Sequence, residues 1–199
     1  MADPGGRSRD WPSNGAGGRP IADVLDAIVA ELLRLELGVA DRLLPGGPFV
    51  PPDGMLLPPS VIEFFSWRGG TRFEDGERIG DSYFIPGYEY PSMEEALERR
   101  RVLDQAGGIG LEGEWLPILL STNGDCYVAV RREDGEAQIA DVLIGEPTTI
   151  EFSSLQSFLE TCLAAFRTGA FYLGPDGFLE LDPQRYDGLT DAAKAEEDT

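Results

Sequence analysis

Apolar residues recur at helical spacing near the start of the chain. They are Ile21, Val24, Leu25, Ile28, Leu32 and Leu35. This spacing of three and four positions is typical of an amphipathic helix with one buried face. Pro20 suits the first turn of such a helix and Gly38 suits its end. The pattern therefore predicts a helix of about four to five turns after Pro20.

The second half of the chain has the pattern of β-strands joined by tight turns. Three strand-like runs cover 115–120, 126–131 and 138–143, and they are separated by Thr-Asn-Gly-Asp and Glu-Asp-Gly-Glu. Asn-Gly and Asp-Gly are strong hairpin signals because both turn residues take positive φ, which Gly adopts freely. The runs predict an antiparallel meander. A short strand over 148–152 is predicted to follow it.

A Pro-rich loop precedes a second predicted helix. Residues 39–57 hold four prolines and three glycines among apolar residues, which predicts an ordered loop packed on the body. The helix then starts at Pro58 and is ended by Gly69-Gly70 after Trp67. The glycine pair is predicted to stop the helix because it lacks Cβ atoms, so no phosphate-binding role follows from it.

Two later helices are predicted from their caps. One begins with Ser92 as N-cap, has acidic residues in its first turn and arginines towards its end, which complements the helix dipole. The other follows a Ser cap, and its apolar face includes Cys162, which is predicted to be a small buried hydrophobic residue. A short strand over 83–85 and a final hairpin within 171–181 complete the predicted elements.

The order of these elements predicts an α+β fold, an antiparallel β-meander sheet flanked by helices. Residues 20–181 are predicted to form a single domain, which is long enough for one sizeable core. Residues 1–19 are rich in Gly, Pro, Ser and Arg and are predicted to be a disordered N-terminal tail. Residues 182–199 are predicted to be an acidic, flexible C-terminal tail.

Charge is the strongest compositional feature of the chain. It has 36 acidic and 16 basic residues, and its formal net charge at pH 7 is -20. Such a surface repels nucleic-acid phosphates and anionic membranes, since both are bound through Lys and Arg. The predicted partner is therefore a basic protein, with no direct nucleic acid and no membrane. The alternative is that the acidic charge only keeps the protein soluble.

The chain has no histidine and two cysteines, Cys126 and Cys162. Ser-His-Asp and Cys-His nucleophilic sites are thereby excluded, and a zinc site needs about four ligands. Asp125 would raise the pKa of the adjacent Cys126 thiol, so the pair is predicted to be structural. We expect no catalytic residue, metal or cofactor. The enzymatic alternative is a hydrolase using Glu94 and Glu95, but adjacent helix positions point about 100° apart.

The first 20 residues contain no apolar run of the kind that forms the core of a signal peptide. No stretch approaches the roughly 20 apolar residues of a membrane-spanning helix. We therefore expect a cytoplasmic location, where both thiols stay free.

Three segments, in order, resemble the SUKH superfamily, which includes fungal cell-wall assembly regulators and bacterial immunity proteins. They are LPPSVIEFFSWRGG, EWLPILLSTNGDCYVAV and SSLQSFLETCL, and the resemblance covers roughly residues 21–168. In that pattern Leu-Pro opens a helix ended by a Gly-containing turn, and a Trp-x-Pro-Ile strand leads through Gly-Asp into the next strand. The matching positions are Leu57, Pro58, Gly69, Gly70, Trp115, Pro117, Ile118, Gly124 and Asp125.

The resemblance implies a non-enzymatic domain that acts by binding protein. Bacterial members resemble antidotes that cap a toxin domain, often a nuclease. The net charge points the same way, because a nuclease is basic where it grips phosphates. The leading hypothesis is therefore an immunity-type protein that neutralises a basic toxin. The alternative is a scaffold or regulatory module that binds endogenous proteins.

Candidate contacts with the partner lie in the charged and aromatic stretch over 72–90. Acidic side chains suit electrostatic steering, and aromatic side chains suit anchoring. The predicted partner-binding residues are Glu74, Asp75, Glu77, Asp81, Tyr88, Glu89 and Tyr90. The alternative is that this stretch is a solvated loop with a few core aromatic residues.

Overall fold

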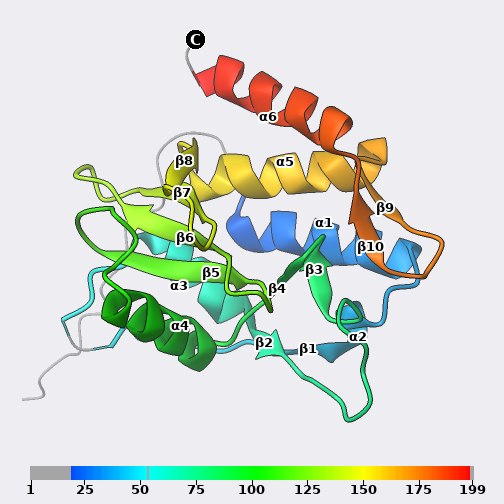
Figure 1. Cartoon of the computed structure of the whole chain (residues 1–199), viewed down its shortest axis with the longest axis horizontal. Coiled ribbons are helices and arrows are strands. Elements are labelled where there is room, and N and C mark those ends of the chain that lie inside the picture. Colours follow the sequence, from blue (N-terminus) through cyan, green and yellow to red (C-terminus); the bar gives the residue numbers. More distant parts are fainter. Residues whose placement is uncertain (1–18, 53, 198–199) are drawn as a thin grey trace, which may run out of the picture.

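The computed structural model describes residues 19–52 and 54–197. The described chain forms a curled antiparallel sheet flanked by helices, which is an α+β fold (Figure 1). The sheet has six strands in the order β3-β4-β5-β6-β7-β8, so neighbours in the sheet are neighbours in sequence. The predicted antiparallel meander is confirmed.

Five of the six strands form where the strand-like runs and turn signals predicted them, to within one residue at each end. Their bounds are β3 Tyr83–Ile85, β4 Tyr88–Glu89, β5 Trp115–Leu120, β6 Cys126–Arg131, β7 Ala137–Val142 and β8 Thr149–Phe152. The turn between β5 and β6 contains Gly124 at φ 109°, a value that glycine adopts without strain. The strand β4 was not predicted, because two residues give no readable alternation.

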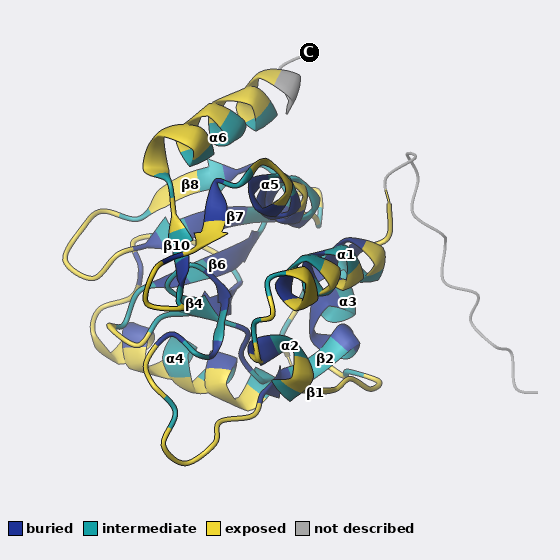
Figure 2. Cartoon of the chain, turned by 90° about the vertical axis from the view of Figure 1, so that its right-hand side faces the viewer, coloured by how far each residue is buried: buried dark blue, intermediate teal, exposed yellow. Residues whose placement is uncertain are grey.

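Both faces of the sheet are covered, which explains why its central strands are almost wholly apolar. One face carries Leu116, Ile118 and Ile139, which belong to a core shared with α1 and α5. The other face carries Val128 and Val130, which pack in a smaller cluster with Leu103 of α4, Trp115 and Cys126. Figure 2 shows that buried residues gather in the sheet and in helix α5, while α6 is mainly exposed.

The helices are α1 Ile21–Arg34, α2 Val39–Arg42, α3 Pro59–Trp67, α4 Met93–Gln105, α5 Leu155–Thr168 and α6 Pro183–Glu197. The predicted serine caps are present, but α1 ends at Arg34, and Gly38, which was predicted to end it, is the N-cap of α2. The Ser92 and Glu95 side chains form a capping box at the start of α4, and Ser154 accepts a hydrogen bond from the Ser157 backbone N–H at 3.0 Å. The predicted loop over 39–57 is partly regular, since it holds α2 and the first strand of a small sheet.

Gly69 and Gly70 lie in a strand. The helix α3 ends at Trp67 as predicted, and β2 (Arg68–Thr71) then pairs with β1 (Leu43–Pro45). Gly70 has φ 103°, and a Cβ there would lie 2.6 Å from the Ser92 backbone nitrogen. The prediction that this pair acts only as a helix terminator was therefore incomplete, because Gly70 also permits a close approach of two backbones.

The prediction of a flexible tail from residue 182 was wrong for α6. The predicted hairpin forms as β9 (Phe171–Leu173) and β10 (Leu179–Leu181), and α6 begins directly after it. Tyr186 stacks on Phe171 with ring centroids 5.3 Å apart, and Leu189 also packs against the core. Two anchors one helical turn apart are enough to dock an otherwise polar helix. The predicted disordered tail over 1–19 lies outside the described residues, except for Arg19.

Candidate functional site

The predicted partner-binding residues do not form one surface. Glu74 and Asp75 are exposed in the loop between β2 and β3, and Glu74 pairs with Arg72 at 3.0 Å. Tyr90 is 1% exposed, and its hydroxyl donates a hydrogen bond to the Phe64 carbonyl oxygen. The prediction that Tyr90 contacts a partner was wrong, because its ring belongs to the core.

Three of the remaining predicted residues are engaged within the protein. Glu77 pairs with Arg42 of α2. Asp81 accepts hydrogen bonds from the backbone and side chain of Arg78, both at 3.0 Å, and these hold the pKa of Asp81 below its usual value. Glu89 accepts a hydrogen bond from the Ser82 hydroxyl, while burial raises the pKa of Glu89. These carboxylates stabilise the loop, which leaves them less available to a partner.

The residues that carry the resemblance to the SUKH superfamily lie at the start of a helix, in strands and in their turns. Pro58 is the N-cap of α3, and Trp115 is buried in β5 with the Arg100 guanidinium 5.3 Å from its ring centroid. Pro117 is also buried in β5, next to an irregularity in the pairing with β6. These three residues therefore have places in a helix start and in the sheet, and none of them lines the groove described below.

Asp125 holds two turns together. Its Oδ2 accepts a hydrogen bond from Asn123 Nδ2 at 2.7 Å, and its Oδ1 accepts one from the Ile144 backbone N–H at 2.9 Å. The neighbouring Cys126 is buried in β6, and burial raises the pKa of its thiol to about 12. The Asp125 charge adds to this rise, as the sequence predicted. At neutral pH the Cys126 thiol is therefore protonated and shielded from solvent.

An open groove of about 1250 Å³ lies between α4 and the turn that joins β5 to β6. Its apolar surface comes from three separate segments: the loop after β2, the helix α4 and the end of β5. Phe73 and Val102 are 51% and 50% exposed, which is high for large apolar side chains. The partly buried side chains of Met93, Leu97 and Leu120 complete this apolar lining.

The rim of the groove is charged. Glu94 is exposed and has no hydrogen-bond or ion-pair partner among the described residues, whereas Glu98 is paired with Arg101 at 2.6 Å. Glu95 accepts hydrogen bonds from the backbone and hydroxyl of Ser92, both at 2.7 Å. Glu94 and Glu95 thus have different environments, and only Glu94 has its charge fully available to a partner.

Arg99 joins the two walls of this groove. Its guanidinium donates hydrogen bonds to the carbonyl oxygens of Gly124 and Ser121, the second at 3.4 Å. These bonds satisfy two backbone acceptors at the turn and hold the turn against α4. Because these acceptors are uncharged, Arg99 keeps its positive charge at the wall of the groove.

The groove was largely missed by the sequence analysis. Of the seven predicted contact residues, only Glu89 lines it. Its signals in the sequence were single apolar residues in charged surroundings, Phe73 in RFEDGER and Val102 in ERRRVLDQ. Such residues become informative only when the fold shows that they line the same groove.

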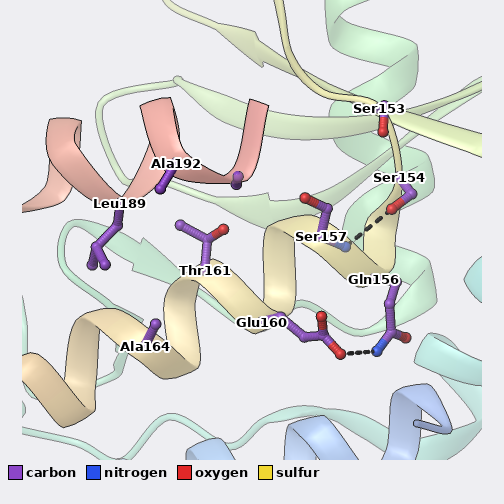
Figure 3. Close-up of a pocket in the computed structure, with 10 residues that line it drawn as sticks. Ser153, Ser154, Gln156, Ser157, Glu160, Thr161, Ala164, Leu189 and Ala192 are labelled. Carbon is purple, nitrogen blue, oxygen red and sulfur yellow. Dashed lines mark hydrogen bonds between the residues drawn. The ribbon is translucent and has the colours of Figure 1, made fainter. Parts of the chain in front are cut away.

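A smaller hollow of about 460 Å³ lies between α5 and α6 (Figure 3). Its lining consists mainly of small and hydroxyl-bearing side chains. Gln156 donates a hydrogen bond to Glu160 at 2.5 Å, and Ser154 caps the helix through Ser157. Because these polar groups bond along α5 itself, the hollow is less suited to partner recognition than the groove beside α4.

No three Asp, Glu or Cys side chains among residues 19–52 and 54–197 are close enough to hold a metal ion. Each helix in the same residues is too short or too polar to span a bilayer. A scan against protein-family models and a search of curated proteins found no match to the chain.

Proposed function

We propose that this protein is a non-enzymatic binding module that docks a basic protein partner into the groove beside α4. The observation that supports this proposal most directly is the combination, in one open groove, of exposed apolar side chains with an unpaired carboxylate. Phe73 and Val102 supply the apolar surface, and Glu94 supplies the free charge. Interfaces commonly combine a desolvated apolar centre with a charged rim.

The chemistry of the groove defines the partner segment. It would insert one or two apolar side chains between α4 and the β5–β6 turn, and it would place Lys or Arg beside Glu94. The apolar contacts would supply most of the affinity, while the charges would steer the encounter. The net charge of -20 extends this attraction over the whole molecule.

The biological role that fits best is that of an immunity-type protein, which neutralises a basic toxin by covering its active surface. The resemblance to the SUKH superfamily and the acidic charge both favour this role. A nuclease toxin suits the charge because its phosphate-binding cleft must be basic. The second candidate is a scaffold of the cell-wall assembly regulator type, which the same resemblance supports.

The proposal is tested by affinity capture with the purified protein, followed by a toxicity assay of the captured basic protein with and without co-expression of this chain. One tight complex and restored growth would support the immunity role. Several weak partners without toxicity would support the scaffold. Failure to recover any basic partner would count against both.

Groove variants then test the site with that partner. Glu94→Lys reverses the free rim charge and Val102→Arg places a cation on the apolar surface, so each should weaken binding by about tenfold or more. Glu133→Lys makes the same charge change on an exposed residue of the β6–β7 turn, at the other end of β6. The affinity of each variant for the partner is measured by calorimetry. If all three variants bind with equal affinity, the groove is not the binding site.

A further inference from the structure

A second polar cluster lies on the α5-facing side of the sheet. It consists of Tyr88 in β4, Tyr127 in β6 and Asp141 in β7. The two tyrosine rings pack with centroids 4.8 Å apart, and Tyr127 is the register partner of Asp141 across the β6–β7 ladder. All three residues are partly buried, and none of them lines the groove beside α4.

Asp141 has an unsatisfied buried oxygen. Its Oδ1 atom is shielded from solvent and has no hydrogen-bond partner among the described residues. The charged side chains that act on it most strongly are two further carboxylates, Glu151 and Asp125. Burial first, and then these two charges, raise the pKa of Asp141 to about 6, and a hydrogen bond from the Val142 backbone opposes this rise. A partly buried carboxylate with one unpaired oxygen is costly unless a hydrogen-bond donor or a cation meets that oxygen.

The residues around Asp141 do not supply that cation. Lys194 of α6 pairs with the neighbouring Glu151 at 3.2 Å and is not among the charges that act on Asp141. The Tyr186 hydroxyl of α6 is hydrogen-bonded to the Cys162 sulfur, and burial raises the pKa of Tyr186. Tyr127 is largely buried, and among the described residues its hydroxyl has no hydrogen-bond partner. The cluster therefore combines an unmet acceptor, a free hydroxyl and two aromatic rings.

We propose that Tyr88, Tyr127 and Asp141 bind an organic cation with N–H donors, either a primary ammonium or a guanidinium group. Its N–H groups would satisfy Asp141 Oδ1, and its charge would lie against the tyrosine rings through cation–π attraction. A bare divalent ion fits poorly, because it needs about six oxygen ligands and the described residues contain no such group of acids. This inference does not depend on the groove beside α4.

The cation can come from two sources, a Lys or Arg side chain of a protein or a free small amine. Three probes distinguish them: putrescine, N-acetyl-lysine amide and N-acetyl-arginine amide, each titrated into the full chain at constant ionic strength. Ring signals of ¹³C-labelled tyrosine, assigned with Tyr88→Phe and Tyr127→Phe, report the site. Dissociation constants on the order of 1 mM are expected. If putrescine binds more tightly than the other two probes, the cation is a free amine. If N-acetyl-lysine amide or N-acetyl-arginine amide binds more tightly, the cation is a protein side chain.

Asp141→Asn is the decisive variant, because it removes the charge and keeps the shape. It should weaken binding of the best probe by about tenfold or more. Glu133→Gln removes one exposed charge elsewhere and should leave binding unchanged. The wild-type protein should also release protons on binding near pH 6, measured by calorimetry in two buffers with different ionisation enthalpies. The proposal would be overturned if the probes shifted the tyrosine signals no more than potassium chloride does. It would also be overturned if the best probe bound Asp141→Asn and wild type with equal affinity.

Discussion

Gly70 lies where two segments of backbone come too close for a side chain. A Cβ at this position would lie 2.6 Å from the Ser92 nitrogen, and the φ of 103° is itself unfavourable for other residues. Gly70→Ala should therefore lower the free energy of unfolding by about 3 kcal/mol or more. Gly87→Ala is the matched control, since Gly87 has φ 83° but open space around it, and should cost about 1 kcal/mol. Both free energies of unfolding are measured by urea denaturation. Equal decreases in Gly70→Ala and Gly87→Ala would refute the argument from close backbone approach.

Asp141 makes the stability of the fold depend on pH. Its pKa is about 6, compared with an ordinary value of 3.8, so between these values the folded state binds more protons than the unfolded state. The free energy of unfolding therefore falls as pH rises from about 4 to 6 and stays lower above pH 6. Asp141→Asn should relieve this penalty and stabilise the protein at pH 7.5 by about 1 kcal/mol, a value discounted for partial exposure.

The measurement is denaturant unfolding of wild type and variant at pH 4 and pH 7.5. The stabilisation by Asp141→Asn should appear at the higher pH and vanish at the lower. Asp81→Asn is a control of opposite sign, because Arg78 lowers the pKa of Asp81 and its charge stabilises the fold above pH 4. A difference between wild type and Asp141→Asn that is constant with pH would contradict this account.

At the scale of elements, α6 is held by few apolar contacts. The Tyr186 ring packs on Phe171, and the Tyr186 hydroxyl is hydrogen-bonded to the buried Cys162 thiol. Tyr186→Ala should release the helix locally and expose Cys162, so its reaction with a thiol reagent should accelerate by about tenfold or more relative to Cys126. Tyr172→Ala, at a 37% exposed position in β9, should leave both rates unchanged. Parallel acceleration of both thiols would instead indicate global destabilisation.

The elements differ in how readily they could be predicted. The helix α5 was predicted because its apolar face and Ser154 cap are local signals, and β5 and β6 were predicted because Asn-Gly separates two apolar runs. The helix α6 was missed because its pattern has only two anchors, Tyr186 and Leu189, whose value depends on the core they reach.

At the scale of the whole molecule, the charge of -20 acts before any contact forms. Association with a basic partner should therefore be fast at low salt. The association rate constant should fall by about tenfold or more between roughly 50 mM and 500 mM salt, because screening shortens the reach of the charges. Stopped-flow mixing at several salt concentrations measures this. If dissociation alone responds to salt, the acidic surface does not steer the encounter.

By itself the sequence determined the meander, most of the helices, the acidic charge and the burial of Cys162, whereas the burial of Cys126 was decided by the fold. These features follow from periodicity, caps, turns and composition, which are local or additive. The tertiary structure decided which charged and aromatic residues are free. It pairs Glu77 with Arg42, 35 positions away, buries Tyr90 against Phe64, and brings Phe73, Val102 and the β5–β6 turn into the lining of one groove. Burial and pairing depend on contacts between distant segments, so only the fold could separate the structural carboxylates from the available ones.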